Sequence, residues 1–141
     1  MPKSAPHGRK NGSQIMISYL DTNIAIFLHS GNVARLTRRA AEQIESADLL
    51  VSAMVMLELE MLYGKGAIKY HASQILSDLN QQIGVSVCQF PMAVVMSNAL
   101  RLKWTREPGD RIIVANAIAN NEAPLVTSDR RIMEEYPNAI W

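Results

Sequence analysis

The sequence lacks several features that would place it in a specialised class of protein. It has a single cysteine, Cys88, so it forms no intrachain disulfide, and the residue is expected to be a small buried core residue in a reducing cytosol. No apolar run approaches the roughly 18 residues that a membrane span needs, so we expect a soluble, cytoplasmic protein without a membrane partner. The net charge of +1 excludes a strongly basic chain, so any basic surface must be local.

Other absences exclude two kinds of binding site. No cluster of histidine and cysteine offers zinc ligands, and His29 and His71 are interpreted as surface or capping residues. The triplet Gly64-Lys65-Gly66 lacks the spacing and the Ser or Thr of a phosphate-binding loop, so it is interpreted as helix punctuation. We find no internal repeat.

The composition is that of an ordinary globular domain. The chain has 141 residues, of which 48% are hydrophobic and 19% charged. Residues 1–15 show no hydrophobic period and no apolar segment that would make a secretory signal. We therefore expect a flexible tail over 1–15 and one domain over 16–141.

Short apolar runs alternate with segments of helical period. The expected strands are Ile17–Leu20, Leu49–Ser52, Val85–Gln89 and Pro124–Thr127, with an edge strand at Ala139–Trp141. The expected helices are Asn23–Leu28, Val33–Ala47, Ala53–Tyr63, Ala67–Ile83, Pro91–Trp104, Asp110–Asn121 and a short one headed by Asp129. This alternation predicts an α/β fold, a parallel sheet with helices on both faces.

One predicted helix carries a basic face. The polar side of Val33–Ala47 bears Arg35, Arg38 and Arg39. Such a run is either a solvated helix face or a contact for a phosphate backbone, and the sequence leaves both open.

Three acids follow or approach the carboxyl ends of strands. Asp21 ends the first strand, Asp129 comes two residues after the fourth, and Asp110 lies in the first turn of the helix that leads into the fourth. Ligands of open α/β sheets gather at this edge, so these side chains are expected to meet. Each acid alone could equally be a helix cap.

A fourth acid comes from the second unit, and helix geometry chooses between two candidates. The neighbours of Glu58 on its face are all apolar, whereas Glu60 lies nearer the helix end. A carboxylate on an apolar stripe is costly unless a cation compensates it, so Glu58 is the candidate. Four clustered carboxylates repel one another, and an all-oxygen set favours Mg²⁺ or Mn²⁺.

Four segments, in this order, resemble the PIN-domain ribonucleases, especially VapC-type toxins. They are Tyr19-Leu20-Asp21-Thr22-Asn23, Ser52 with Leu57-Glu58-Leu59, Gly109-Asp110-Arg111-Ile112-Ile113-Val114-Ala115, and Leu125-Val126-Thr127-Ser128-Asp129. The resemblance runs from Ile17 to the end of the chain. Glu107-Pro108 keeps only part of the Asp-Pro that the family often has before the third acid.

The resemblance implies a fold, an activity and partners. The fold would be a PIN-like three-layer α/β/α sandwich with a central parallel sheet. Its acidic pocket would bind Mg²⁺ or Mn²⁺ through Asp21, Glu58, Asp110 and Asp129, with Thr22, Asn23, Thr127 and Ser128 as accessory polar groups. The substrate would be RNA, and the partners a cognate antitoxin and a second copy of the chain in a homodimer. The groove for the antitoxin would lie at Asn23–Leu28 and Ala53–Leu62, and the dimer faces at Val33–Ala47 or Ala67–Ile83.

Three alternatives remain beside the toxin. An RNA-processing PIN nuclease would have the same site. A haloacid-dehalogenase-type phosphatase would need a second Asp where Asn23 stands and an Asp where Ser128 precedes Asp129. A scaffold that only binds RNA or protein would not need all four acids.

Overall fold

A computed structural model describes residues 16–141, so the expected tail over 1–15 lies outside the described residues. Five parallel strands form one sheet in the order β3-β2-β1-β4-β5. The strands are β1 (Ile17–Leu20), β2 (Asp48–Val51), β3 (Ser86–Val87), β4 (Leu125–Val126) and β5 (Ala139–Ile140). The predicted edge strand at the end of the chain is confirmed as β5.

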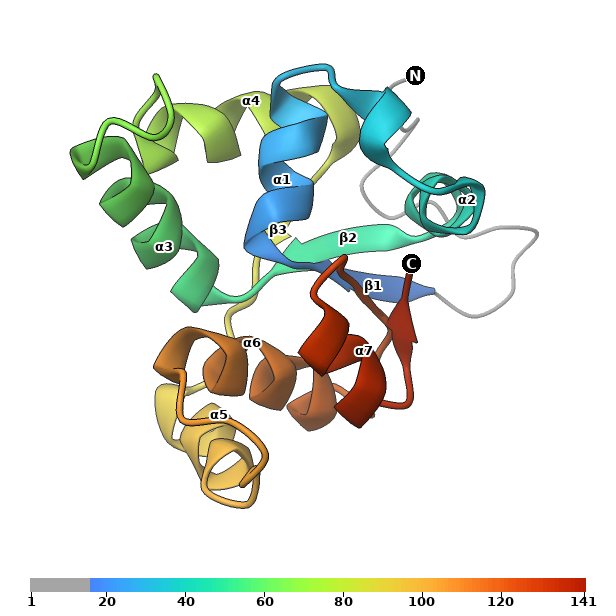
Figure 1. Ribbon diagram of the computed structural model, residues 1–141, viewed down its shortest axis with the longest axis vertical. Helices are drawn as coiled ribbons and strands as arrows, with labels where there is room; N and C mark the ends of the chain where they lie inside the picture. The colour runs from blue at the N-terminus through green and yellow to red at the C-terminus, as the bar shows by residue number, and fades with distance from the viewer. Residues whose placement is uncertain (1–15) are drawn as a thin grey trace.

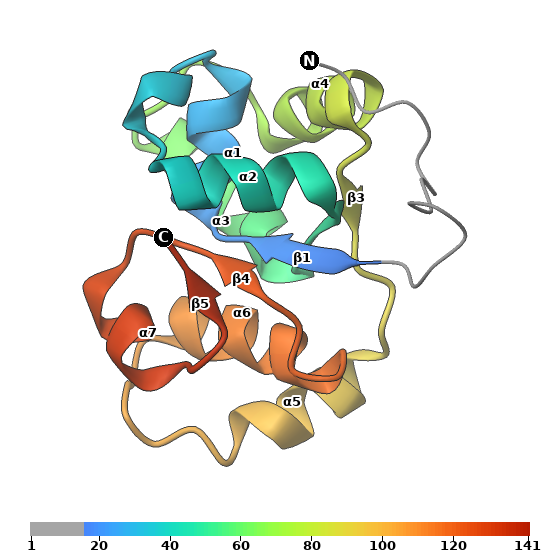
Figure 2. The ribbon, with the colours of Figure 1, turned by 90° about the vertical axis from the view of Figure 1, so that its right-hand side faces the viewer.

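Helices cover both faces of this sheet (Figure 1; Figure 2). One layer comprises α1 (Thr22–His29), the 3-10 helix η2 (Val33–Arg35), α2 (Arg38–Ser46), α3 (Ala53–Gly64) and α4 (Ala72–Ile83). The other comprises α5 (Met92–Ala99), α6 (Pro108–Ala119) and α7 (Arg130–Glu135). The predicted three-layer α/β/α architecture is therefore confirmed.

Three predicted helices have the wrong extent. The single helix over Val33–Ala47 is wrong, because Thr37 caps α2 by accepting a hydrogen bond from the Ala40 amide at 3.0 Å, and η2 precedes it. The helix predicted from Ala67 begins at Ala72, whose amide donates to the Glu60 carboxylate. The helix predicted to Trp104 ends at Ala99, so residues 100–107 form a loop.

The strand order fixes where a site can form. The chain passes from β1 outward through β2 to β3 and then returns across the sheet to β4, on the other side of β1. The connections that leave β1 and β4 therefore run to opposite faces of the sheet. Such a switch point opens a crevice at the carboxyl ends of the two strands, which here precede Asp21 and Asp129.

The core lies between the sheet and its two helical layers. Tyr19 and Leu20 of β1 and Leu125 of β4 have no solvent exposure, so the central strands are buried on both faces. Within residues 16–141 no helix is long and apolar enough to cross a membrane.

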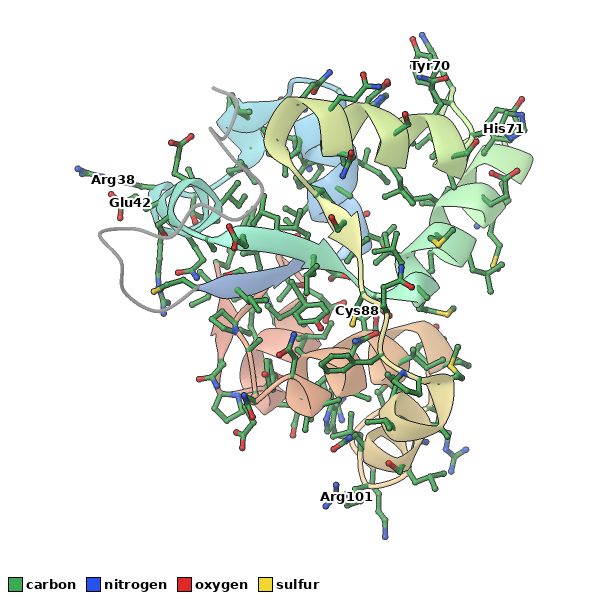
Figure 3. The ribbon with its side chains drawn as sticks, turned by 180° about the vertical axis from the view of Figure 1, so that it is seen from behind. Arg38, Glu42, Tyr70, His71, Cys88 and Arg101 are labelled. Carbon is green, nitrogen blue, oxygen red and sulfur yellow. The ribbon has the colours of Figure 1, made fainter. Side chains whose placement is uncertain are left out.

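A polar network joins β1 to α6 beneath the sheet. The Tyr19 hydroxyl donates to Cys88 Sγ at 3.1 Å, and Asn116 Nδ2 donates to the same sulfur at 3.2 Å. Burial, with the hydrogen bond to Cys88, raises the pKa of Tyr19 well above its usual range. Cys88, predicted as a small buried core residue, packs against the core after β3 but is only partly buried (Figure 3).

Candidate active site

Asp21 lies where β1 gives way to α1. It caps α1, and its Oδ1 accepts a hydrogen bond from the Thr22 amide at 2.8 Å. Its Oδ2 accepts from the Thr127 hydroxyl at 2.6 Å, and only 8% of the residue is exposed. Burial raises the pKa of Asp21 against the lowering effect of these two hydrogen bonds, and the charge of Asp129 raises it further.

Thr127 connects Asp21 to Asp129. Its hydroxyl oxygen donates to Asp21 and also accepts from the Asp129 amide at 3.0 Å. Asp129 caps α7 through its Oδ1, which accepts from the Ile132 amide at 2.9 Å. Asp21 and Asp129 therefore are helix caps, as each could be from its sequence position. Both residues also line the same crevice.

Glu58 projects from α3 toward the same crevice. Its Oε1 accepts a hydrogen bond from the Thr22 hydroxyl. Its Oε2 rests on the backbone of α6, because a Cβ added to Gly109 would lie 2.0 Å from that oxygen. Only glycine leaves room for the carboxylate in this position. Burial, together with the charges of Asp21 and Glu107, raises the pKa of Glu58 above its usual range.

Glu60 is directed elsewhere, as the helix geometry predicts. One of its oxygens accepts from the Ala72 amide at 3.0 Å and the other pairs with His71 Nδ1 at 2.9 Å. Both contacts stabilise the start of α4. Those hydrogen bonds lower the pKa of Glu60, the opposite of the shift at Glu58.

Asp110 is partly buried among other acids. It stands in the first turn of α6, and within residues 16–141 its carboxylate forms no side-chain hydrogen bond or ion pair. Burial and the charges of Asp129, Asp21, Glu58 and Glu107 raise its pKa to about 6. A carboxylate in such surroundings is stabilised by a bound proton or by a nearby cation.

The four acids line one pocket of about 290 Å³. The remaining lining residues are Thr22, Asn23, Met61, Leu62 and Lys65. Ser128 is not part of this lining, and of the two accessory candidates after β4 it is Thr127 that contacts an acid.

The pocket supplies the donor chemistry that Mg²⁺ or Mn²⁺ prefers. Its acidic groups offer carboxylate oxygens alone, without nitrogen or sulfur. In the part of the chain that the structure describes, no three His, Cys, Asp or Glu side chains converge closely enough to form a ready-made ligand set. Asp21, Glu58 and Asp129 each direct an oxygen to a hydrogen-bond donor of the protein. The residues fit a divalent cation that would draw these oxygens together.

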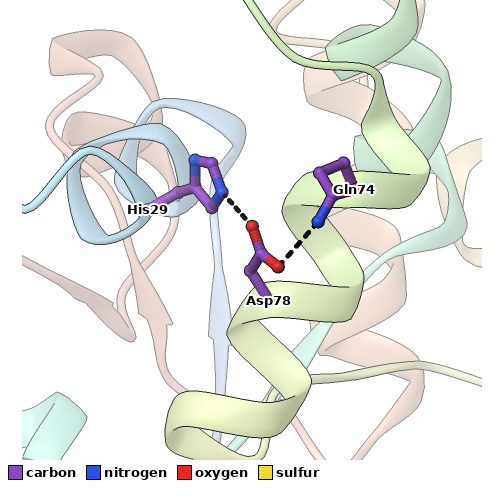
Figure 4. Close-up of polar contacts among 3 residues, drawn as sticks. All are labelled: His29, Gln74 and Asp78. Atoms are coloured by element: carbon purple, nitrogen blue, oxygen red, sulfur yellow. Dashed lines mark hydrogen bonds and ion pairs between the residues drawn. The ribbon is translucent and has the colours of Figure 1, made fainter.

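The two histidines within residues 16–141, His29 and His71, lie outside the pocket. His29 Nε2 lies 2.7 Å from Asp78 Oδ2, and Gln74 donates to the other oxygen of Asp78, so the three side chains tie α1 to α4 (Figure 4). The hydrogen bond from His29 lowers the pKa of Asp78. His71 stacks on Tyr63 and pairs with Glu60.

Sequence reasoning missed three parts of the pocket. Met61 and Leu62 belong to the apolar face around Glu58 and line the pocket beside it. Lys65 lies two helical turns after Glu58, a spacing that would have placed it on the same face. Gly109 gave a weaker signal, a glycine in the first turn of a helix immediately before an acid.

Comparison with known families and structures is consistent with this geometry. A sequence model of the family described as PIN domain matches residues 18–138. No curated protein matches this sequence.

Several solved structures of similar fold are of toxin–antitoxin complexes. A chain of VapBC2 from Rickettsia felis, solved bound to a DNA fragment from the promoter, is 21% identical, with a TM-score of 0.57 over 88% of this chain and 96% of that chain. A chain of a toxin–antitoxin complex from Klebsiella pneumoniae is 23% identical, with a TM-score of 0.57 over the same shares. A chain of DNA-bound VapBC from Salmonella typhimurium is 19% identical, with a TM-score of 0.54 over 89% and 96%.

Proposed function

Because this chain belongs to the PIN domain family, whose members are nucleases, we propose that it is an endoribonuclease that depends on Mg²⁺ or Mn²⁺. The observation that carries the proposal is the pocket in which four acids from four parts of the chain repel one another. A nuclease needs such a site, because phosphodiester cleavage develops negative charge that a divalent ion neutralises. A structural set of helix caps does not explain Glu58 or Asp110, which cap nothing.

In this proposal Asp21, Glu58, Asp110 and Asp129 hold the ion, which when bound neutralises phosphate charge and acidifies water. Thr127 fixes the rotamer of Asp21, and Thr22 fixes that of Glu58. Asn23 and Lys65 offer hydrogen-bond donors at the pocket wall to the substrate phosphate. Ser128 is the weakest of the accessory candidates.

The carboxylates orient a water in line with the scissile phosphate and accept its proton. The water oxygen bonds to phosphorus as the bond from phosphorus to the 3′ oxygen breaks. That oxygen takes up a proton from the solvent, and the carboxylate returns the proton of the attacking water to the solvent. The products are a 5′-phosphate and a 3′-hydroxyl. The 2′-hydroxyl of the RNA takes no part as a nucleophile.

A phosphatase of the haloacid-dehalogenase type is disfavoured by the residues and by the family match. Its nucleophilic Asp would be followed two positions later by a second Asp, where this chain has Asn23. A scaffold that only binds RNA or protein is disfavoured because selection for binding would not maintain four mutually repelling carboxylates.

We further propose that the nuclease is the toxin of a type II toxin–antitoxin pair and acts in the cytoplasm. The fold it shares with chains of toxin–antitoxin complexes supports this role. An antitoxin could insert an Arg into the acidic pocket, where a guanidinium pairs with carboxylates and excludes the ion. Met56, Leu57 and Met61 on the exposed side of α3 offer an apolar anchor beside it. A homodimer is part of the same proposal.

The nuclease proposal is tested by incubating the purified chain with single-stranded and hairpin RNA, with Mn²⁺ or Mg²⁺ and then with EDTA. We expect metal-dependent cleavage that leaves 5′-phosphates, and unchanged cleavage of RNA whose 2′-hydroxyls are methylated at the cut site. Full activity in EDTA, or cyclic phosphate ends, contradicts the proposed chemistry.

The toxin role has its own test in the host. Expression alone should arrest growth, and co-expression with the product of the adjacent gene should restore it and yield a stable complex. If the purified protein cuts RNA while its expression leaves growth unaffected, the RNA-processing nuclease takes the place of the toxin.

A further inference from the structure

The acidic pocket creates a problem for an RNA-binding protein. Four carboxylates repel the phosphates of a strand that must approach within contact distance of them. The net charge of +1 offers no general attraction. Salt screens exposed charges beyond about 8 Å at physiological ionic strength, so any cations that hold the strand must lie close to the pocket.

One basic segment runs from the end of α5 to the edge of the pocket at the start of α6. The loop of residues 100–107, here called the basic loop, carries the exposed side chains of Arg101, Lys103 and Arg106. It ends at Glu107, directly before α6, whose first turn carries the pocket residue Asp110, so the end of the loop borders the pocket.

The start of α7 brings a further cation to the edge of the pocket. Asp129 lines the pocket as the cap of α7, and the exposed Arg130 follows it directly. Arg131 then donates to the Trp104 carbonyl and lies with its guanidinium carbon 6.0 Å from the centre of the Trp104 ring. The start of α7 and the basic loop are therefore in contact beside the acids.

The basic loop is anchored to neighbouring helices at two points and has one hydrogen bond within itself. Arg111 Nη2 donates to the Ala99 carbonyl at 2.8 Å where the loop begins. Arg131 holds its middle at Trp104, which also packs against the core. Near its end the Thr105 hydroxyl accepts from the Glu107 amide at 3.1 Å. These contacts hold the backbone of the loop, which reduces the entropy lost on binding.

These cations are not engaged by acids of the protein. Within residues 16–141, Arg101, Lys103, Arg106 and Arg130 form no ion pair. Arg38 on α2, by contrast, pairs with Glu42 at 3.3 Å. Figure 3 shows Arg38 and Glu42 projecting from the upper helical layer and Arg101 from the far end of α5 in the lower one.

We propose that the basic loop, together with Arg130, binds the phosphate backbone of the single-stranded RNA that enters the acidic pocket. The inference rests on the proposed nuclease function and adds the path of the substrate to it. It also distinguishes the two basic surfaces of the molecule, because Arg35, Arg38 and Arg39 on η2 and α2 then face solvent and do not bind RNA.

The test compares two triple variants that remove the same charge. The loop variant is Arg101→Gln, Lys103→Gln, Arg106→Gln, and the control is Arg35→Gln, Arg38→Gln, Arg39→Gln on η2 and α2, all exposed positions. Binding of a labelled single-stranded RNA is measured in EDTA over a range of salt, and KM and kcat are measured with Mn²⁺. Residues 1–15 are identical in all proteins and contribute equally.

We expect the loop variant to bind RNA roughly 10- to 100-fold more weakly, with a salt slope lower by about 2, because each phosphate contact on a single strand contributes about 0.7 to the slope. Its KM should rise while kcat stays near that of wild type, and the control should match wild type. Arg101→Lys, Arg106→Lys should keep the wild-type slope, which separates charge from loop folding.

Equal RNA affinity and equal salt slopes for the two triple variants would overturn the inference. A loop variant that loses affinity for polyglutamate but not for RNA would also overturn it, because the surface would then bind an acidic protein. If wild type binds RNA with the expected slope but never cuts it, the proposed nuclease function fails while the binding surface stands.

Discussion

Asp110→Asn should stabilise the metal-free protein at neutral pH, because Asp110 lies among like charges and its side chain forms no hydrogen bond within residues 16–141. Burial and the neighbouring acids raise its pKa from an ordinary 3.8 to about 6. A folded-state pKa above the unfolded value means that the stability contributed by Asp110 is fully present below about pH 4 and is lost as pH rises through about 6.

The size of the effect follows from the shift. A difference of 3.8 to about 6 corresponds to about 3 kcal/mol as an upper bound, and the partial exposure of Asp110 to solvent reduces this to about 1–2 kcal/mol. For a chain of this length such a gain raises the melting temperature by roughly 3–8 °C.

Calorimetry in EDTA at pH 7.5 and pH 4 measures this difference. Asp110→Asn should melt higher than wild type at pH 7.5 and equally at pH 4, whereas Glu134→Gln, at an exposed position of α7 outside the pocket, should change neither. Destabilisation at pH 7.5, or the same gain at both pH values, would refute the reasoning, since the first indicates a structural role and the second an uncharged packing effect.

Two further predictions concern the same pocket. Gly109→Ala should displace the Glu58 carboxylate and reduce RNA cleavage by at least about 100-fold, since a misplaced catalytic group is costly. Gly64→Ala is the control and should leave the rate unchanged, because a Cβ at Gly64 has no atom within 4 Å. Similar rates for the two variants would contradict the role of the contact between Glu58 and Gly109. Mn²⁺ or Mg²⁺ should raise the melting temperature of wild type but raise that of Asp110→Asn much less, as mass action requires of a lost ligand; equal rises would remove Asp110 from the ligand set.

The sequence predicts the fold well where local signals agree with tertiary packing. β1 was predictable because Ile17–Leu20 is a short apolar run that stops at a helix cap. The break before α2 was not predictable, because the apolar period continues from Val33 through Leu36. The break arises where the Thr37 hydroxyl accepts a hydrogen bond from the Ala40 amide. The start of α4 depends on Glu60, twelve residues earlier in the chain, which no local pattern indicates.

The same division holds for the pocket. The acids could be brought together from strand ends and helix faces, because parallel strands carry their carboxyl ends to one edge. The close approach of Glu58 to Gly109 could not, since it depends on how α3 packs on α6. The basic loop was hidden for a similar reason, because the helix predicted to Trp104 included Arg101 and Lys103, whereas α5 ends at Ala99.

The central claim, that the acidic pocket carries out RNA cleavage, is tested most directly by a pair of substitutions two residues apart. Glu58 faces the pocket and Glu60 caps α4, so Glu58→Gln should reduce the rate of RNA cleavage in Mn²⁺ by at least about 100-fold while Glu60→Gln stays within about threefold of wild type. Equal losses, or a greater loss for Glu60→Gln, would contradict the account, because they would show that cleavage takes place elsewhere on the molecule.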